Sequence, residues 1–259
     1  MKQMITLLAV LALAAAAFAE GLPSSKATAD VNTLVRCVMT TAQVGELPAL
    51  LPANCVDLFT GATVTTNGAW IEIASKPVKL SNSQSLFVSP SLVSGLYTRT
   101  RTKTQDGSTS TAQAQGAVYM RAVLVDGDQN EIVAAPLNLC TSNIFGCSQQ
   151  SGKWGVVLDS RIQTLTQDIT ACTVVVDGGG AGTCDFTSTI DFILQTASAN
   201  TFNFIFPDVG QGTYTLKIYA AVGSGATIIA GSGTAVGAAA FGLGSVTAES
   251  VRLVHDFVF

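Results

Sequence analysis

The sequence predicts an all-β fold, an antiparallel β-sandwich or jelly roll with one short N-terminal helix and disulfide bonds. Segments rich in Val, Ile, Thr, Phe and Tyr, the residues that favour strands, recur throughout the chain. Turn signals such as NG, DG, GG and SG separate them roughly every ten to fifteen residues. Because no strong helical patterns alternate with these segments, a parallel α/β sheet is disfavoured.

The expected strands are half-buried ones, as a sandwich requires. In residues 213–222, Leu216 and Ile218 share one face, while Lys217 and Tyr219 share the other. The full set of expected strands is AWIEIA (69–74), SLFVS (85–89), GAVYMRAVLVD (116–126), EIVAA (131–135), WGVVLD (154–159), CTVVVD (172–177), STIDFILQT (188–196), TFNFIF (201–206), TYTLKIYAAV (213–222) and ESVRLVHDFVF (249–259).

The one expected helix lies in residues 30–43, within a lead-in, residues 20–66, that is irregular or helical. Asp30 can cap its start. Behind Asp30, apolar residues recur at helical spacing, namely Val31, Leu34, Val35, Val38 and Met39. Several of them are β-branched, which weakens the helical pattern.

Residues 1–19 have the pattern of a secretory signal peptide. Lys2 supplies the positive region, an apolar run extends from Ile5 to Phe18, and Ala-Phe-Ala gives a small-residue cleavage site. The run is short for a transmembrane span. We therefore expect residues 20–259 to form a single secreted β-sandwich domain, located outside the cell or at its surface.

Export gives the cysteines an oxidising environment, in which an even number of them indicates disulfides. The spacing favours three pairs that are close in the sequence, each around a turn-rich stretch, although six cysteines allow fifteen pairings. Zinc is disfavoured because C-x-x-C spacing is absent and the chain has one histidine. The favoured pairs are Cys37 with Cys55, Cys140 with Cys147, and Cys172 with Cys184.

Charged residues are sparse, and this narrows the choice of partner. The formal net charge is −4, or −5 once Lys2 is removed with the signal, and only 12% of residues are charged while 48% are hydrophobic. Nucleic acids attract clustered Lys and Arg, so they are an improbable partner. So little charge suggests that part of the surface is buried in a partner or in copies of the chain.

Two segments have a biased composition. Residues 102–116 are polar and are interpreted as a bridge between strands. Residues 220–245 are rich in Gly and Ala, and form either a small-residue hairpin that packs closely or a mobile loop.

Arg99, Arg101 and Lys103 alternate with threonines, which places the three cations on one face of a strand. The favoured interpretation is an ordinary solvated strand whose cations also protect a sheet edge from pairing. The alternative is a ligand face for acidic glycans or anionic surfaces. Interleaved aromatic residues, on which nucleic-acid bases would stack, are absent.

Asp126, Asp128 and Asn130 occupy the first, third and fifth positions of a calcium-loop pattern. The sixth and twelfth positions are Glu131 and Leu137 instead of Gly and Glu, so the segment fails as an EF-hand. Asp-Gly between two apolar strands favours a hairpin turn, and an irregular calcium site stays open as the weaker alternative.

No catalytic constellation stands out, and the expectation is a protein that is not an enzyme and has no cofactor. The single histidine, His255, lies beside Asp256 in the last expected strand, and no G-x-S-x-G serine accompanies it. The glycine-rich stretches 177–184 and 230–242 lack the βαβ context, or the Lys-Ser/Thr, of phosphate-binding loops. Nothing singles out a glycosidase pair among the carboxylates.

Two other classes stay open. A carbohydrate-binding module would need an exposed aromatic platform, for which the candidates are Trp70, Trp154, Tyr97 and Tyr119. An outer-membrane barrel would explain the terminal Phe259 after alternating apolar positions, but six cysteines and few Trp and Tyr residues argue against it.

The segments SLFVSPSLVSGLYTRTRTKT, ANTFNFIFPDVGQGTYTLKIYAAV and GSVTAESVRLV together resemble a type of secreted β-sandwich protein of unassigned function, over about 70 residues. The resemblance implies a fold and an extracellular setting, and it carries no functional residues. The expected function is an exported structural or binding module at the cell surface or outside the cell, one that could assemble with copies of itself or bind an extracellular glycan.

Overall fold

The described part of the chain is an all-β sandwich with two disulfides. The computed structural model describes residues 26–45, 55–59, 61–105, 107–143, 146–170, 173–176, 180–183 and 187–252. The expected signal peptide (1–19), the pair Cys172 and Cys184, and His255 lie outside the described residues. No helix within the described ranges is long and apolar enough to cross a membrane.

Sheet A has seven strands, and its main order is β12-β5-β15-β2-β3, with β1 beside β15 and β13 beside β5. All of these pairs are antiparallel except that of β2 with β3. Its strands are β1 (Ala27–Asn32), β2 (Arg36–Val44), β3 (Thr63–Val64), β5 (Gln84–Gln105), β12 (Thr187–Thr201), β13 (Phe204–Val209) and β15 (Ser232–Val251).

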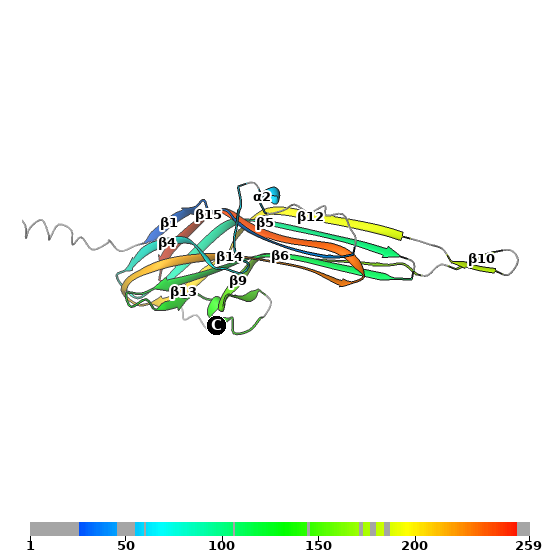
Figure 1. Ribbon diagram of the computed structural model, residues 1–259. Coiled ribbons are helices and arrows are strands. Elements are labelled where there is room, and N and C mark those ends of the chain that lie inside the picture. The colour runs from blue at the N-terminus through cyan, green and yellow to red at the C-terminus, as the bar shows by residue number, and fades with distance from the viewer. Residues whose placement is uncertain are drawn as a thin grey trace, which may run out of the picture.

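Sheet B has six strands in the order β4-β14-β6-β9-β8, with β7 beside β6. Its strands are β4 (Ile71–Leu80), β6 (Thr109–Val125), β7 (Glu131–Val133), β8 (Cys147–Gln150), β9 (Lys153–Asp168) and β14 (Gly212–Ala230). A separate hairpin of β10 (Thr173–Val176) and β11 (Gly180–Thr183) lies between β9 and β12 in the chain and extends beyond the ends of the long strands (Figure 1).

The predicted N-terminal helix is wrong. Residues 27–32 and 36–44 are β1 and β2, and both pair with β15, so the expected lead-in is part of sheet A. The β-branched residues that weakened the helical pattern fit a strand better, because pairing with a buried neighbour decides the outcome. In this region the described helix is α2 (Cys55–Leu58), a single turn, and a 3₁₀ turn, η1 (Leu137–Leu139), follows later.

Two of the expected disulfides are confirmed. Cys37 on β2 bonds Cys55 at the start of α2, and Cys140 after η1 bonds Cys147 at the start of β8. The described cysteines include no free thiol. The first bond holds α2 against sheet A, and the second closes the loop that leads into β8.

The interior changes along the length of the sandwich. One half holds a large apolar core of Leu, Val, Ile and Phe side chains, among them Phe204, Phe206 and Phe241. Toward the turn that connects β5 in sheet A to β6 in sheet B, the buried residues become small, with Ala112, Ala114 and Ala235 in contact. Long strands therefore continue past the main core, and Figure 1 shows them as the extended part of the molecule.

The predicted polar bridge at residues 102–116 is wrong, because most of that segment belongs to β5 and β6. Its small side chains let the two sheets lie close together. The Gly- and Ala-rich segment 220–245 is neither a mobile loop nor a hairpin of two paired strands. It runs from β14 in sheet B, through a turn at Gly231, into β15 in sheet A. It packs closely, as expected, with Ala235, Val236, Ala238 and Ala239 fully buried.

Candidate functional site

The three cations of β5 lie on the outer face of sheet A, as the alternation predicts. Their threonine neighbours, including Thr98 and Thr100, are fully buried between the sheets. The predicted role in protecting an edge is wrong, because β5 pairs with β12 on one side and β15 on the other. Arg99 Nη2 lies 2.5 Å from Asp191 Oδ2 on β12, so part of this charge is used within the sheet.

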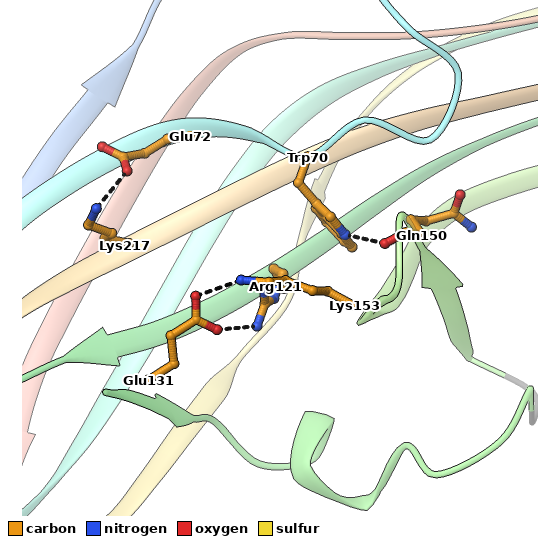
Figure 2. A network of polar contacts seen from close by, with 7 residues as sticks. All are labelled: Trp70, Glu72, Arg121, Glu131, Gln150, Lys153 and Lys217. Atoms are coloured by element: carbon orange, nitrogen blue, oxygen red, sulfur yellow. Dashed lines mark hydrogen bonds and ion pairs between the residues drawn. The ribbon is translucent and has the colours of Figure 1, made fainter. Parts of the chain in front are cut away.

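Trp70 is not an exposed platform. Its indole Nε1 donates a hydrogen bond to the carbonyl oxygen of Gln150 at 2.7 Å, and its ring lies over Gly155, where an added Cβ would be 2.3 Å from a ring carbon. The guanidinium of Arg121 lies 5.9 Å from the ring centroid, a cation–π contact. Figure 2 shows this arrangement on the outer face of sheet B.

The residues proposed for a ligand face are not brought together. Trp154 packs against the main core, and Trp70 lies on sheet B. The cations of β5 lie on the opposite outer surface, with the sandwich between them. Of the two tyrosines considered for an aromatic platform, Tyr97 is buried, whereas Tyr119 lines a hollow.

Beneath Trp70, one carboxylate binds two cations. Arg121 is almost fully buried, and its Nη2 lies 3.0 Å from Glu131 Oε2, while Lys153 Nζ lies 2.8 Å from Glu131 Oε1 (Figure 2). Partial burial alone would raise the pKa of Glu131. The hydrogen bonds and positive charges of Lys153 and Arg121 outweigh this effect and hold the pKa below its ordinary value of 4.5.

Acid is expected to weaken this network. A carboxyl group whose pKa is lowered by folding stabilises the folded state above its ordinary pKa, and that contribution is lost as the pH falls through the lower, folded-state value. The urea midpoint of unfolding should therefore fall as the pH drops below 4.5. Glu131→Gln should lower the midpoint at neutral pH, because buried Arg121 loses its counter-charge, and should flatten the acid decline. Glu249→Gln, outside the network, is the control. An unchanged acid slope in Glu131→Gln contradicts the assignment.

The Asp-Gly segment is the predicted hairpin turn, which joins β6 to β7. Asp126 Oδ1 accepts hydrogen bonds from the backbone N–H groups of Asp128 and Asn130 at 2.9 and 2.8 Å. The bonds from Asn130, then that from Asp128, lower the pKa of Asp126. The carboxylate is therefore occupied in holding the turn. Within the described residues, no group of three His, Cys, Asp or Glu side chains is placed to hold a metal ion.

A hollow of about 780 Å³ lies on sheet B between β8, β9 and the middle of β6. Its lining includes Asn67, Gln115, Tyr119, Asp159 and Arg161. Burial, only partly offset by a hydrogen bond with Ser148, raises the pKa of the Tyr119 phenol, so this group stays protonated near neutral pH. The hollow has amide, hydroxyl and guanidinium groups and the carboxylate of Asp159, whose Oδ2 accepts a hydrogen bond from Ser94 Oγ at 2.5 Å.

Between β5 and β9, the interior is a ladder of hydrogen-bonded side chains. Thr98 Oγ1 donates to Gln163 Oε1 at 2.7 Å, and Gln163 Nε2 donates to Thr100 Oγ1 at 2.6 Å. Thr102 Oγ1 donates to Gln167 Oε1 at 3.0 Å. These contacts place β9 directly beneath β5. β8 pairs only with residues 153–156 of β9, so beside Gln163 and Gln167 β9 is the last described strand of sheet B, whereas sheet A continues to β12.

This overhang leaves β12 exposed on both faces and along one edge. Nearly every described side chain of the strand is exposed, including Ile190 (41%), Phe192 (48%), Ile193 (52%) and Leu194 (38%). Along its other edge, β12 has no partner strand in the described part of the chain. Apolar side chains of this size are normally buried, and an exposed group of them marks an interaction surface. This surface is therefore the candidate functional site.

Unlike β12, the neighbouring strand β13 on the same side of β5 is covered. β13 continues the line of β12 along β5, and its Ile205 forms a two-way backbone bridge with Ala135 of the segment after β7, with N···O distances of 2.7 and 3.0 Å. That bridge closes the sandwich over the apolar core. Beside β12 no such backbone bridge occurs among the described residues. Side chains of β9 reach the strand instead, with Gln163 Nε2 donating to the Phe192 carbonyl oxygen at 3.0 Å and Arg161 Nη2 to Thr196 Oγ1 at 2.9 Å.

Residues 188–196 are predicted as a strand and lie in β12, but their role as an exposed surface is not among the predictions from the sequence. The signal was present, because the run Ile190, Phe192, Ile193 and Leu194 puts apolar side chains on both faces of one strand. Such a pattern predicts a strand that is buried on both faces. That the fold leaves this strand at an edge became visible only from the sheet order.

No protein-family model and no curated protein matches the chain. Among solved structures, the chain is similar to a chain in the structure of the infectious bursal disease virus Gx strain. The sequence identity is 12%, the match covers 90% of this chain and 45% of the viral chain, and the TM-score is 0.23. A VP2 subviral particle of the same virus gives 11% identity over 91% and 45%, at 0.18. Tailspike protein 4 of bacteriophage CBA120 gives 10% over 77% and 19%, at 0.13. The chain spans less than half the length of each. TM-scores of this size do not identify a shared fold, so the function has to be inferred from the chain's own surface.

Proposed function

We propose that the chain is an exported structural subunit that assembles with copies of itself outside the cell. The observation that carries this proposal is the exposure of β12 on both faces and one edge. An unpaired strand edge binds another strand through its free backbone N–H and C=O groups, and natural β proteins blunt such edges when they do not use them. Here neither a proline nor a lysine interrupts the strand.

Two further features support this function. The two disulfides suit an oxidising compartment, as does the expected signal peptide. The small number of charges over the whole sequence leaves little repulsion between copies. The carbohydrate-binding alternative is weaker, because both tryptophans are used in internal contacts.

Light scattering across a concentration series tests the function directly, with the oxidised protein after removal of residues 1–19. We expect the weight-average mass to rise with concentration above that of one chain. Raising the salt concentration should leave the association largely intact, because apolar and backbone contacts are screened little by salt. A mass that stays at one chain up to millimolar concentration contradicts the proposal.

A further inference from the structure

We infer that two copies of the chain pair through β12, antiparallel and around a two-fold axis at Phe192, so that the two A sheets become one continuous sheet. This inference rests on the proposed function and names the surface that carries it.

The apolar residues of β12 are arranged symmetrically about Phe192. Ile190, Phe192 and Leu194 lie opposite Thr102, Thr100 and Thr98 of β5, whose side chains are buried between the sheets. Directly opposite residues in an antiparallel pair share a face, so these three apolar side chains all point toward the side of sheet B.

A two-fold axis at Phe192 makes this set self-complementary. Phe192 then faces Phe192 of the partner subunit, and Ile190 faces Leu194 of the partner subunit, as Leu194 faces the partner's Ile190. All three cross-strand pairs on that face are apolar, which is the pairing that stabilises sheets. Two-fold contacts of this kind are the commonest in symmetric oligomers.

The charge of the strand also suits a second copy. In residues 187–201, the one ionisable side chain is Asp191, and it is bound by Arg99 of the neighbouring strand. When two identical edges meet, the two Asp191 carboxylates would be diagonal neighbours, about 7–8 Å apart, and each keeps its own Arg99 as counter-charge. This edge offers no unpaired charge that could bind a strongly charged partner.

Pairing would also fill the space under the overhang. Strands in a sheet lie about 4.8 Å apart, so three strand spacings would separate β5 from its copy across the two β12 strands, a distance of about 14 Å. Beneath each β5 lies a β9, held by the Thr–Gln ladder. The six apolar side chains of the paired β12 strands would occupy the gap between the two β9 strands and would no longer be exposed to water.

Cysteine cross-linking tests the register. In Phe192→Cys, the two new thiols face each other, at a Cα separation of 4.5 to 5.5 Å typical of antiparallel pairs, which a disulfide accepts. We expect mild oxidation of the folded protein to give a covalent dimer in high yield. In Thr189→Cys, also an exposed position on the same strand, the thiols would lie about 20 Å apart and should stay free. In Ile193→Cys, the two thiols would be diagonal neighbours on the outer face, about 7–8 Å apart, which exceeds the usual reach of a disulfide, so this variant should give much less dimer.

The outcomes separate this inference from the proposed function. If the chain assembles but Phe192→Cys gives no dimer, or Ile193→Cys or Thr189→Cys gives as much dimer, the pairing around Phe192 is overturned while self-assembly stands. If light scattering shows one chain at every concentration, both are overturned. Equal cross-linking in a mixture of Ile190→Cys and Leu194→Cys chains, and none in either alone, would further support the register.

Discussion

Replacing Phe192 with lysine is expected to abolish self-association. The change places two ammonium groups opposite each other at the two-fold axis, in a strip that is otherwise apolar. We expect an association at least about 30-fold weaker, equivalent to ~2 kcal/mol, because central aromatic residues dominate interface energies. Sedimentation equilibrium of the native and variant chains at matched concentrations measures the difference.

The fold should survive this change, because Phe192 is 48% exposed and surface substitutions shift stability little. Val31→Lys is the matched control, since Val31 is an exposed apolar residue (73%) on β1, on another strand of sheet A. It should associate as the native chain does. Equal loss of association in both variants would place the interface elsewhere, and loss in neither would remove β12 from the interface.

Gly237→Ala is expected to destabilise the fold severely. An added Cβ at Gly237 would lie 2.1 Å from the carbonyl oxygen of Gln115 and 2.3 Å from that of Gly225, which belong to β6 and β14 of the other sheet. These are backbone atoms in paired strands, so they cannot move aside singly. We expect a loss of at least about 3 kcal/mol, the upper end for overpacked cores.

Thermal unfolding followed by circular dichroism measures this loss, and a decrease of roughly 6–12 °C in the midpoint corresponds to it. Gly127→Ala is the control, because nothing lies within 4 Å of the added Cβ there. It should change stability by less than about 0.5 kcal/mol. A Gly237→Ala variant as stable as the control would mean that the two sheets can separate at this point.

The small residues around Gly237 explain how a long sandwich can continue past its apolar core. Gly116 on β6 faces the carbonyl oxygen of Ala238, at 2.5 Å from an added Cβ, so the close approach occurs from both sheets. With little room for apolar side chains, β5 and β9 are joined by threonine and glutamine hydrogen bonds instead. The same extension carries β12 beyond the cover of sheet B.

The sequence by itself determined the all-β class, the hairpin turn at Asp126 and the alternation of residues 98–104, and it favoured the two described disulfides among the fifteen possible pairings. Each of these depends on neighbours in the chain: turn residues, period-two patterning and short loops between cysteines. The helix predicted after Asp30 is wrong because the spacing of its apolar residues also suits two short strands. Pairing with β15 decides in favour of the strands.

Only the tertiary structure decided what each surface does. Whether β5 is central or β12 is an edge depends on the order of strands far apart in the sequence, which local patterns do not encode. Trp70 is a packing residue because its ring lies over Gly155 and its indole binds Gln150. Arg121 can be nearly buried because Glu131 supplies its counter-charge. The apolar run of β12 was legible in the sequence, but its exposure arises because sheet A extends one strand beyond sheet B.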